Sequence, residues 1–459
     1  MILNPKIINK KEGRFNFGAN LSVLAPVPLC NQTLAEIWSG FCLRQSKIEF
    51  IPTNQMNILI GDASPIPYSG YEYSINVEEK GIAISAKDTT GLIHGFLTLL
   101  ELINTKKLNE FSIECCNILD APSLKNRMVH ICIFPETDIN FIKRVIRLCG
   151  LLKYSHMIIE FWGMYQYNCL KELSWNNAFT KEELLPVFKE AEHLGMQLIP
   201  MLNHLGHASQ CRLFSGKHVV LDQNPSLAGY FEQDGWAWDI KNEETHSLLR
   251  KMREELITLF PKAEFFHLGC DEVYSYTQDI NKANQLVKYI NSISEELNNK
   301  GLRAIIWGDM LIHKDAFEQY VNKYEFNLEN HDINMLATLD KNIIIADWQY
   351  HATKAPLLSS LHFAKHGFDT MCCPWSETDN IKANANTAIQ NNLFGVICTT
   401  WHTLNEKMPY LLVSAKECWQ GESDIGYVSL MSTAATALRK VHFAEGVYKN
   451  CGWMDKQIK

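Results

Sequence analysis

The stretch RMVHICIFPETDINFIKRVIRLCGLLKYSHMIIEF, residues 127–161, decides the fold. It opens on an apolar run over 127–133, continues with apolar residues at helical spacing over 138–151, and ends on a second apolar run over 157–161. A strand, an amphipathic helix and a second buried strand in this order predict a β-α-β unit with parallel strands.

The same alternation recurs downstream. Further strand-like runs lie at 197–202, 265–268, 304–307, 343–346, 370–372 and 395–399, and helical patterns lie at 181–194, 243–259 and 282–299. Eight units of strand then helix over about 300 residues predict a (β/α)8 TIM barrel. The loop at 204–241 is long, and long loops at the carboxyl ends of barrel strands usually carry function.

A different pattern precedes the barrel. Short runs rich in Ile and Val at 56–61, 73–77 and 81–86 predict strands, and apolar spacing over 90–103 predicts a helix. The stretch 119–124 has the composition of a linker. We therefore expect an α/β protein with a small α+β domain over 1–120 and a barrel over 121–459, the latter ending in a helical extension from 430.

Composition excludes several classes of function. The 459 residues carry 43 Lys and Arg against 51 Asp and Glu, a formal charge of -8, which argues against nonspecific nucleic-acid binding. The longest apolar stretch, 91–103, is too short to span a membrane, and 1–15 lacks the apolar run of a secretory signal, so we expect a cytoplasmic protein. The 14 cysteines include no C-x-x-C and are expected to be reduced.

A pair of carboxylates follows the fourth expected barrel strand. Asp271 and Glu272 lie in the stretch FHLGCDEVY over 266–274. Two carboxylates held together do not ionise at the same pH, so one serves as an acid while the other stays an anion, the chemistry that cleaves a glycosidic bond. The alternative interpretation is a solvated pair at a helix amino terminus.

Histidines follow the third and fourth strands. His204, His207 and His267 could donate to hydroxyls, hold a carboxylate or ligate a metal. Because their spacing matches no known zinc pattern, we expect no metal, and a metal-dependent hydrolase built on these three is kept as an alternative.

Aromatic residues recur just past the strands. Aromatic faces stack on the apolar faces of a sugar ring, so several at one rim indicate a sugar pocket. The candidates are Trp307 with Asp309, Trp348 with Tyr350, Trp401, and also Trp162, Tyr165 and Trp375. Arg127 opens the first strand, where a charge either forms a salt bridge or reaches substrate hydroxyls.

With these residues in place, the sequence resembles glycoside hydrolase family 20, the β-N-acetylhexosaminidases. The block HLGCDEVY over 267–274 is similar to the His-x-Gly-x-Asp-Glu signature of that family, and the similarity extends over most of the chain. The stretch 82–103 resembles the end of the small domain that precedes the family's barrel. The intracellular hexosaminidase D-like branch fits best.

The resemblance implies roles for individual residues. Glu272 would be the general acid and then the base, and Asp271 would orient the substrate's own 2-acetamido group as it attacks the anomeric carbon. Tyr350 would bind the acetamide oxygen, and Arg127 the sugar 3- and 4-hydroxyls. The remaining residues implied to bind substrate are His207, His267, Trp307, Asp309, Trp348 and Trp401.

The stretch PMLNHLGH over 200–207 departs from the family pattern because it has lost two acidic residues. The sequence thus predicts an exo-acting, retaining β-N-acetylhexosaminidase that releases terminal GlcNAc or GalNAc and needs no cofactor. The alternatives are a sugar-binding barrel with impaired catalysis and, ranked lower, the metal-dependent hydrolase. The expected partner is a glycan or glycoside, without nucleic acid or membrane, and the sequence allows a homodimer.

Overall fold

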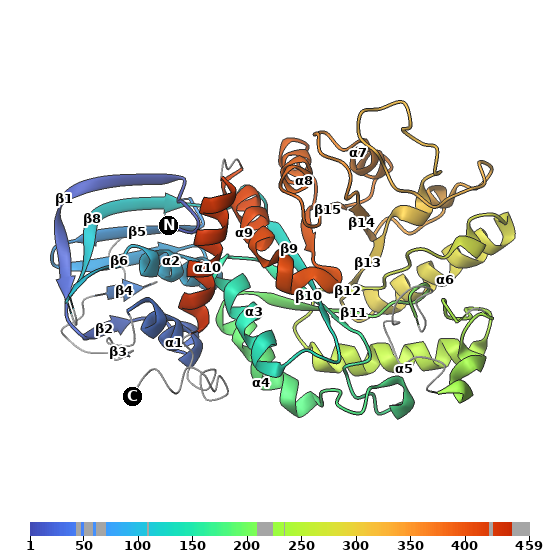
Figure 1. The fold of residues 1–459 in the computed structure, drawn as a ribbon, viewed down its shortest axis with the longest axis horizontal. Helices are drawn as coiled ribbons and strands as arrows, with labels where there is room; N and C mark the ends of the chain where they lie inside the picture. Colours follow the sequence, from blue (N-terminus) through green and yellow to red (C-terminus); the bar gives the residue numbers. More distant parts are fainter. Residues whose placement is uncertain are drawn as a thin grey trace.

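The computed structural model of this chain describes residues 1–42, 47–49, 58–60, 70–107, 110–208, 224–233, 235–421 and 426–442. A mixed sheet with its helices lies beside a closed barrel, and helix α10 (Tyr427–His442) runs between the two (Figure 1). The expected α/β architecture, a TIM barrel preceded by a small α+β domain, is confirmed.

The amino-terminal part forms an eight-stranded sheet in the order β1-β8-β5-β6-β4-β2-β3, with β7 paired to β8. Antiparallel pairing joins β1, β8, β5 and β6, whereas β6, β4, β2 and β3 pair in parallel. The strands are β1 (Ile7–Phe17), β2 (Asn20–Leu24), β3 (Lys47–Glu49), β4 (Ile58–Ile60), β5 (Tyr73–Glu78), β6 (Gly81–Ala86), β7 (Asn104–Lys107) and β8 (Glu110–Asp120).

Helix α2 (Thr89–Glu101) joins the sheet to the barrel. Asp88 caps it by accepting from the Gly91 N–H at 2.9 Å. Every residue from 91 to 100 is buried, the pattern of a helix covered on all sides. One side packs on β5 and β6, and Thr98 on another side accepts a 2.6 Å hydrogen bond from the Lys153 ammonium of the barrel. Helix α1 (Gln32–Phe41) packs beside it.

Eight parallel strands close the barrel, with β16 pairing back to β9. Their inward side chains form one apolar cluster that includes Met128, Ile158, Ile305 and Ile344. Each strand lies within two residues of its expected position: β9 (Asn126–Ile133), β10 (His156–Phe161), β11 (Gln197–Met201), β12 (Phe265–His267), β13 (Arg303–Trp307), β14 (Ile344–Trp348), β15 (Thr370–Cys373) and β16 (Gly395–Thr399).

One of the eight units lacks its helix. Between β13 and β14, residues 308–343 form only two 3-10 turns, η6 (Asp309–Leu311) and η7 (Met335–Ala337). That stretch is rich in Asn and Asp, which favour turns over helix interiors. The other connections hold α3 (Ile139–Leu151), α4 (Lys181–His193), α5 (Glu243–Leu259), α6 (Ile280–Asn298), α7 (Leu358–Lys365) and α8 (Thr378–Gln390), and α9 (Leu404–Gln420) follows β16.

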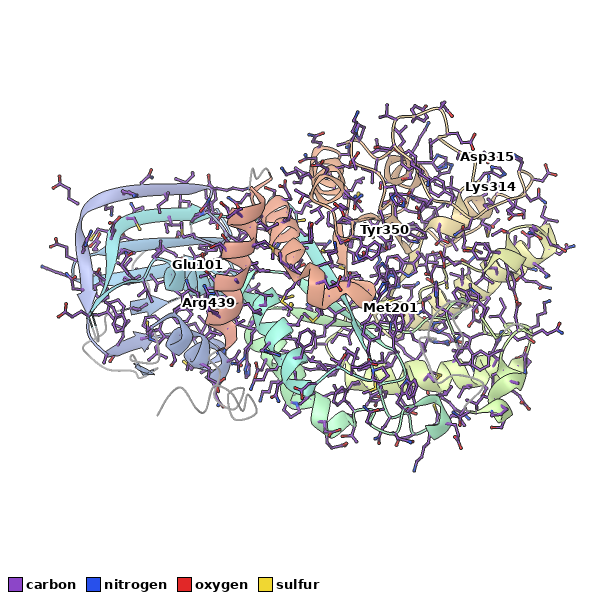
Figure 2. The ribbon with its side chains drawn as sticks, viewed as in Figure 1. Glu101, Met201, Lys314, Asp315, Tyr350 and Arg439 are labelled. Carbon is purple, nitrogen blue, oxygen red and sulfur yellow. The ribbon has the colours of Figure 1, made fainter. Side chains whose placement is uncertain are left out.

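The expected carboxy-terminal extension begins as helix α10, which packs against α1, α3 and α9, while residues 443–459 lie outside the described part of the chain. Figure 2 places Glu101 on the sheet side of α10, and Met201 and Tyr350 on the barrel side. None of the described helices is long and apolar enough to cross a membrane. No disulfide joins the cysteines of the described residues, and most of these thiols are buried.

Candidate active site

The loop after β12 carries the two carboxylates in an unusual backbone conformation. Gly269, Cys270 and Glu272 all have positive φ angles, of +67°, 69° and 50°. Such conformations cost energy for residues other than glycine and concentrate at functional sites. A Cβ on Gly269 would lie 1.9 Å from the Asn203 Oδ1 atom, so only glycine fits where this loop crosses the end of β11.

His207 bridges both carboxylates. Its Nε2 atom lies 3.4 Å from Asp271 Oδ2 and 2.9 Å from Glu272 Oε2. The side chain of Asp271 is 5% exposed and that of Glu272 is 28% exposed, so the two groups differ in access to solvent. Glu272 can therefore exchange a proton with a bound molecule and with water, while Asp271 can act as a fixed, enclosed carboxylate.

Neighbouring loops hold the backbone of Glu272. Its carbonyl oxygen accepts a 2.8 Å hydrogen bond from the indole of Trp236, whose ring lies 4.3 Å from that of His207. Its N–H donates to Asp309 Oδ2 at 3.1 Å. The same Asp309 oxygen accepts from Asn327 Nδ2 at 2.5 Å, so the end of β13 anchors the catalytic loop.

Asp309 is buried among these donors. Burial, and next the charge of Glu272, raise the pKa of Asp309 to about 7. Its second oxygen accepts from the Trp348 indole at 3.2 Å. A carboxyl that titrates near neutral pH beside Glu272 makes the charge of this loop sensitive to pH.

Four of the predicted aromatic residues, Trp307, Trp348, Tyr350 and Trp401, meet at the carboxyl end of the barrel, whereas Trp162 packs on Phe134 and Tyr165 on Phe161. Trp348 stacks on Tyr350 at 5.2 Å between ring centroids, and the Trp401 indole donates to the Tyr350 hydroxyl at 2.8 Å. Trp307 lies 5.6 Å from Trp401 and 4.4 Å from His267. Burial raises the pKa of Tyr350 well above its usual value, and the charge of Asp271 acts in the same direction, so this hydroxyl stays protonated beside the carboxylates.

Comparison with known proteins identifies the family. The glycosyl hydrolase family 20 catalytic domain matches residues 153–407, and domain 2 of that family matches residues 4–121. The chain belongs to glycosyl hydrolase family 20. Membership of this family is what the HLGCDEVY block led us to expect.

The individual relatives are distant. A lacto-N-biosidase of Bifidobacterium bifidum is 21% identical over 72% of this chain and 29% of its own length. Hexosaminidase D of Bos taurus is 26% identical over 29% of this chain and 37% of its own length, so this chain spans less than two fifths of the length of either relative. A family 20 exo-β-N-acetylglucosaminidase structure from Vibrio harveyi shares the fold, with a TM-score of 0.70, 16% identity and coverage of 96% and 77% of the two chains.

Arg127 does not lie in the site, contrary to the resemblance to family 20, which implied that it binds the sugar 3- and 4-hydroxyls. It lies near the start of β9, at the amino-terminal end of the barrel, and its neighbour Met128 occupies the interior. Because successive side chains of a strand alternate, Arg127 points outward. Its guanidinium donates to the carbonyl oxygens of Leu124, at 2.7 Å, and Lys153, at 2.9 Å.

The three histidines of the metal-dependent alternative do not converge. His204 Nδ1 lies 2.7 Å from the Leu202 carbonyl oxygen, and its Nε2 lies 3.0 Å from an Arg253 nitrogen. Burial and the Arg253 charge hold the pKa of His204 well below its usual range. His267 accepts from the Gly269 N–H at 3.0 Å, and His207 contacts the carboxylates. The hypothesis that these three histidines together ligate a metal is therefore wrong.

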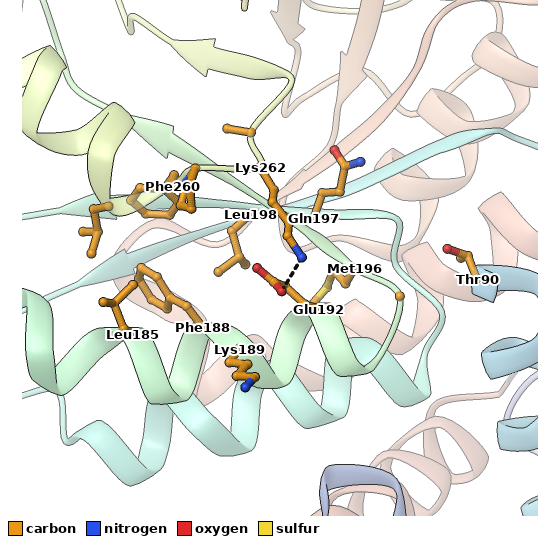
Figure 3. A pocket seen from close by; sticks show the side chains of 14 residues that line it. Thr90, Leu185, Phe188, Lys189, Glu192, Met196, Gln197, Leu198, Phe260 and Lys262 are labelled. Carbon is orange, nitrogen blue, oxygen red and sulfur yellow. Dashed lines mark hydrogen bonds and ion pairs between the residues drawn. The ribbon is translucent and has the colours of Figure 1, made fainter. Parts of the chain in front are cut away.

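A pocket of about 430 Å³ lies away from these carboxylates (Figure 3). It is lined by the start of β11, including Gln197, by α4 and by the end of α5. An ion pair of 2.7 Å between Lys262 and Glu192 lies at its edge. Chemistry in a TIM barrel occurs at the opposite, carboxyl end of the strands, so this pocket is not the active site.

Sequence reasoning overlooked four residues of the site. Trp236 belongs to the long loop after β11, whose length was a signal that could have found it. Asn203 lies two residues beyond the end of β11, Glu160 is the last residue but one of β10, and His130 lies in β9. Those three are polar residues within apolar runs, and a buried polar residue at a strand end is itself a signal of function.

Proposed function

We propose that this chain is an exo-acting, retaining β-N-acetylhexosaminidase that releases terminal GlcNAc or GalNAc by substrate-assisted catalysis. The observation that carries the proposal is the contact of His207 with both an enclosed Asp271 and a more exposed Glu272. Family membership supports a glycosidic substrate, and the hexosaminidases among the relatives support an N-acetylated sugar.

In the first step, Glu272 donates its proton to the glycosidic oxygen as the bond to the anomeric carbon breaks. The acetamide oxygen of the substrate attacks that carbon from the opposite face and forms an oxazolinium ion. Asp271 stabilises the positive charge on the acetamide nitrogen, and its burial strengthens this interaction because the local dielectric constant is low.

In the second step, Glu272 removes a proton from water, which attacks the anomeric carbon and reopens the ring. Two inversions give net retention without a bond between sugar and enzyme, an exception to the two-carboxylate scheme. His207 favours the ionised form of both carboxylates when it is protonated, and the partial exposure of Glu272 allows it to be reprotonated from solvent.

Tyr350 is our candidate for the acetamide oxygen. Its hydroxyl oxygen accepts hydrogen bonds from Trp401 at 2.8 Å and Thr399 at 3.4 Å. A hydroxyl that accepts from two donors can still donate its own proton to a third group. Trp307, Trp348 and Trp401 supply apolar faces for the sugar ring.

Other features of the account stay predictions. We propose that residues 1–120 support the barrel and that residues 121–459 carry the chemistry. Cytoplasmic location, the homodimer and the absence of a required cofactor rest on the sequence alone.

A sugar-binding barrel with impaired catalysis is the second candidate. The outward position of Arg127 favours it, because the expected ligand of the 3- and 4-hydroxyls is missing from the pocket. Tight GlcNAc binding without aglycone release would support that candidate.

The two candidates are separated by release of 4-nitrophenol from its β-GlcNAc glycoside, with a chelator present. We expect turnover by the native protein, a loss of about 1000-fold in the Glu272→Gln variant, and a loss of activity in Asp271→Asn while GlcNAc still binds. Glu264→Gln is the matched control, because Glu264 precedes β12 at the opposite end of the same strand. Equal rates in all four proteins would overturn the proposal.

A further inference from the structure

Three metal-ligating side chains converge inside the mouth of the barrel. His130 and Cys132 are two residues apart on β9, and Cys132 pairs with Glu160 across the β9–β10 ladder. Met128 and Ile158 face the interior, so strand alternation turns His130, Cys132 and Glu160 inward as well. All three side chains are buried.

The three donor atoms form a compact triangle. Glu160 Oε2 lies 3.1 Å from His130 Nε2 and 3.3 Å from Cys132 Sγ, and the sulfur and nitrogen are 3.8 Å apart. Bond lengths to tetrahedral zinc of about 2.0–2.3 Å place two ligand atoms about 3.3–3.6 Å apart. Shifts of a few tenths of an ångström would therefore seat an ion among these atoms.

Neighbouring groups hold the triangle in place. Asn203 Nδ2 donates to Glu160 Oε1, which leaves Oε2 directed at the other two ligands. Thr400 donates to the His130 carbonyl oxygen at 2.8 Å and fixes the end of β9 to β16. Hydrogen bonds of this kind orient metal ligands and raise affinity.

The donor set selects the kind of ion. One imidazole nitrogen, one thiolate and one carboxylate suit zinc, whereas magnesium and calcium prefer oxygen ligands alone. A thiolate and a carboxylate together neutralise the two positive charges, which favours binding in a buried position. We propose that His130, Cys132 and Glu160 bind one zinc ion, with a fourth coordination position open to water.

The position of the zinc site beside the sugar pocket predicts an effect of zinc on catalysis, and this prediction rests on the proposed function. The His130 ring lies 4.8 Å from Trp401 and 6.1 Å from Trp307, which are proposed walls of the sugar pocket. Asn203 also abuts Gly269 of the catalytic loop. We therefore expect zinc bound at this site to disturb the neighbouring pocket and to lower turnover about tenfold.

Binding is tested without reference to activity, by titrating the dialysed full chain with zinc in a calorimeter and with cobalt in a spectrophotometer. We expect one zinc equivalent and a thiolate-to-cobalt charge-transfer band. Cys132→Ser should abolish the band and weaken zinc binding at least about 100-fold. Cys373→Ser, at a buried thiol on β15, is the matched control and should behave like the native protein.

Circular dichroism melts verify folding, and His130→Gln gives a second, independent test of the ligand set. A second trio nearer the surface, His313, Asp315 and His331, also converges but holds no thiol, so it cannot produce the band. No band, or zinc binding unchanged by Cys132→Ser, would overturn the site. Zinc binding without inhibition supports the site and overturns its link to the pocket. The cobalt charge-transfer band does not depend on activity, so it tests the site even if the protein cleaves no glycoside.

Discussion

Replacing Gly269 with alanine tests whether the catalytic loop is held by its fit against Asn203. Gly269 has a φ of +67°, and its added Cβ would lie 1.9 Å from Asn203 Oδ1 and 3.1 Å from Asn203 Cα. Asn203 cannot simply rotate away, because it is buried and its amide donates to Glu160. The loop itself must move.

The size of the effect follows from two contributions. Alanine in the left-handed region costs about 1–2 kcal/mol in folding stability. Restoring ordinary contact of about 3.4 Å also requires a shift of about 1.5 Å between the loop and β11. Because Asp271 and Glu272 follow within three residues, a displacement of that order should lower kcat/KM about 100-fold.

The assay is 4-nitrophenol release together with thermal melts, and Gly301→Ala is the control. Gly301 follows α6 with a φ of +79°, and nothing lies within 4 Å of its added Cβ. That variant should lose about 1–2 kcal/mol of stability and no activity. If Gly269→Ala kept full kcat/KM while losing only as much stability as Gly301→Ala, the loop would not depend on this contact.

Three further predictions concern charged groups. Burial raises the pKa of Asp309 from 3.8 to about 7, so the folded state retains this proton while the unfolded state releases it, and stability falls as pH rises from about 4 to about 7. The free energy of unfolding of Asp309→Asn, measured by denaturant titration, should therefore rise by about 3 kcal/mol relative to that of the native protein between pH 5 and pH 8. An identical pH dependence of the two proteins would contradict this. Arg127→Met should cost about 2–4 kcal/mol, because buried carbonyl oxygens lose their donor, while KM stays unchanged; a tenfold rise in KM would return Arg127 to the pocket. His207→Gln should lower kcat about 100-fold and alter the pH–rate profile, whereas an unchanged profile would remove His207 from the proton chemistry.

The barrel was predictable because its strands are buried on both faces and read as continuous apolar runs. β9 is buried at all eight positions, and the expected run at 127–133 differs from it by one residue. The first strands of the small domain were not predicted: β1 is mostly exposed and polar, in the sequence IINKKEGRFNF, so neither burial nor alternation marks it. Its pairing with β8, nearly 100 residues later, is a long-range contact that no local pattern shows.

The site was predictable where neighbours in sequence are also neighbours in space. Asp271 and Glu272 stand together after a recognisable strand, and the structure brings His207, Asp309, Trp348 and Tyr350 into one chain of contacts with them. Arg127 was misplaced because the direction of a side chain depends on strand register, and a shift of one residue reverses it. Trp236 and Asn203 act through backbone contacts made across loops, which residue type alone does not reveal.

The most direct test of the central claim varies the acetamide group of the substrate. Rates are compared for the 4-nitrophenyl β-glycosides of GlcNAc, of N-trifluoroacetylglucosamine and of glucose, with chelator present. Fluorine withdraws electrons from the acetamide oxygen, so substrate-assisted catalysis predicts fast cleavage of the first, a kcat/KM at least about 100-fold lower for the second, and no cleavage of the glucoside. Equal rates on all three would show that the acetamide takes no part and would contradict the account.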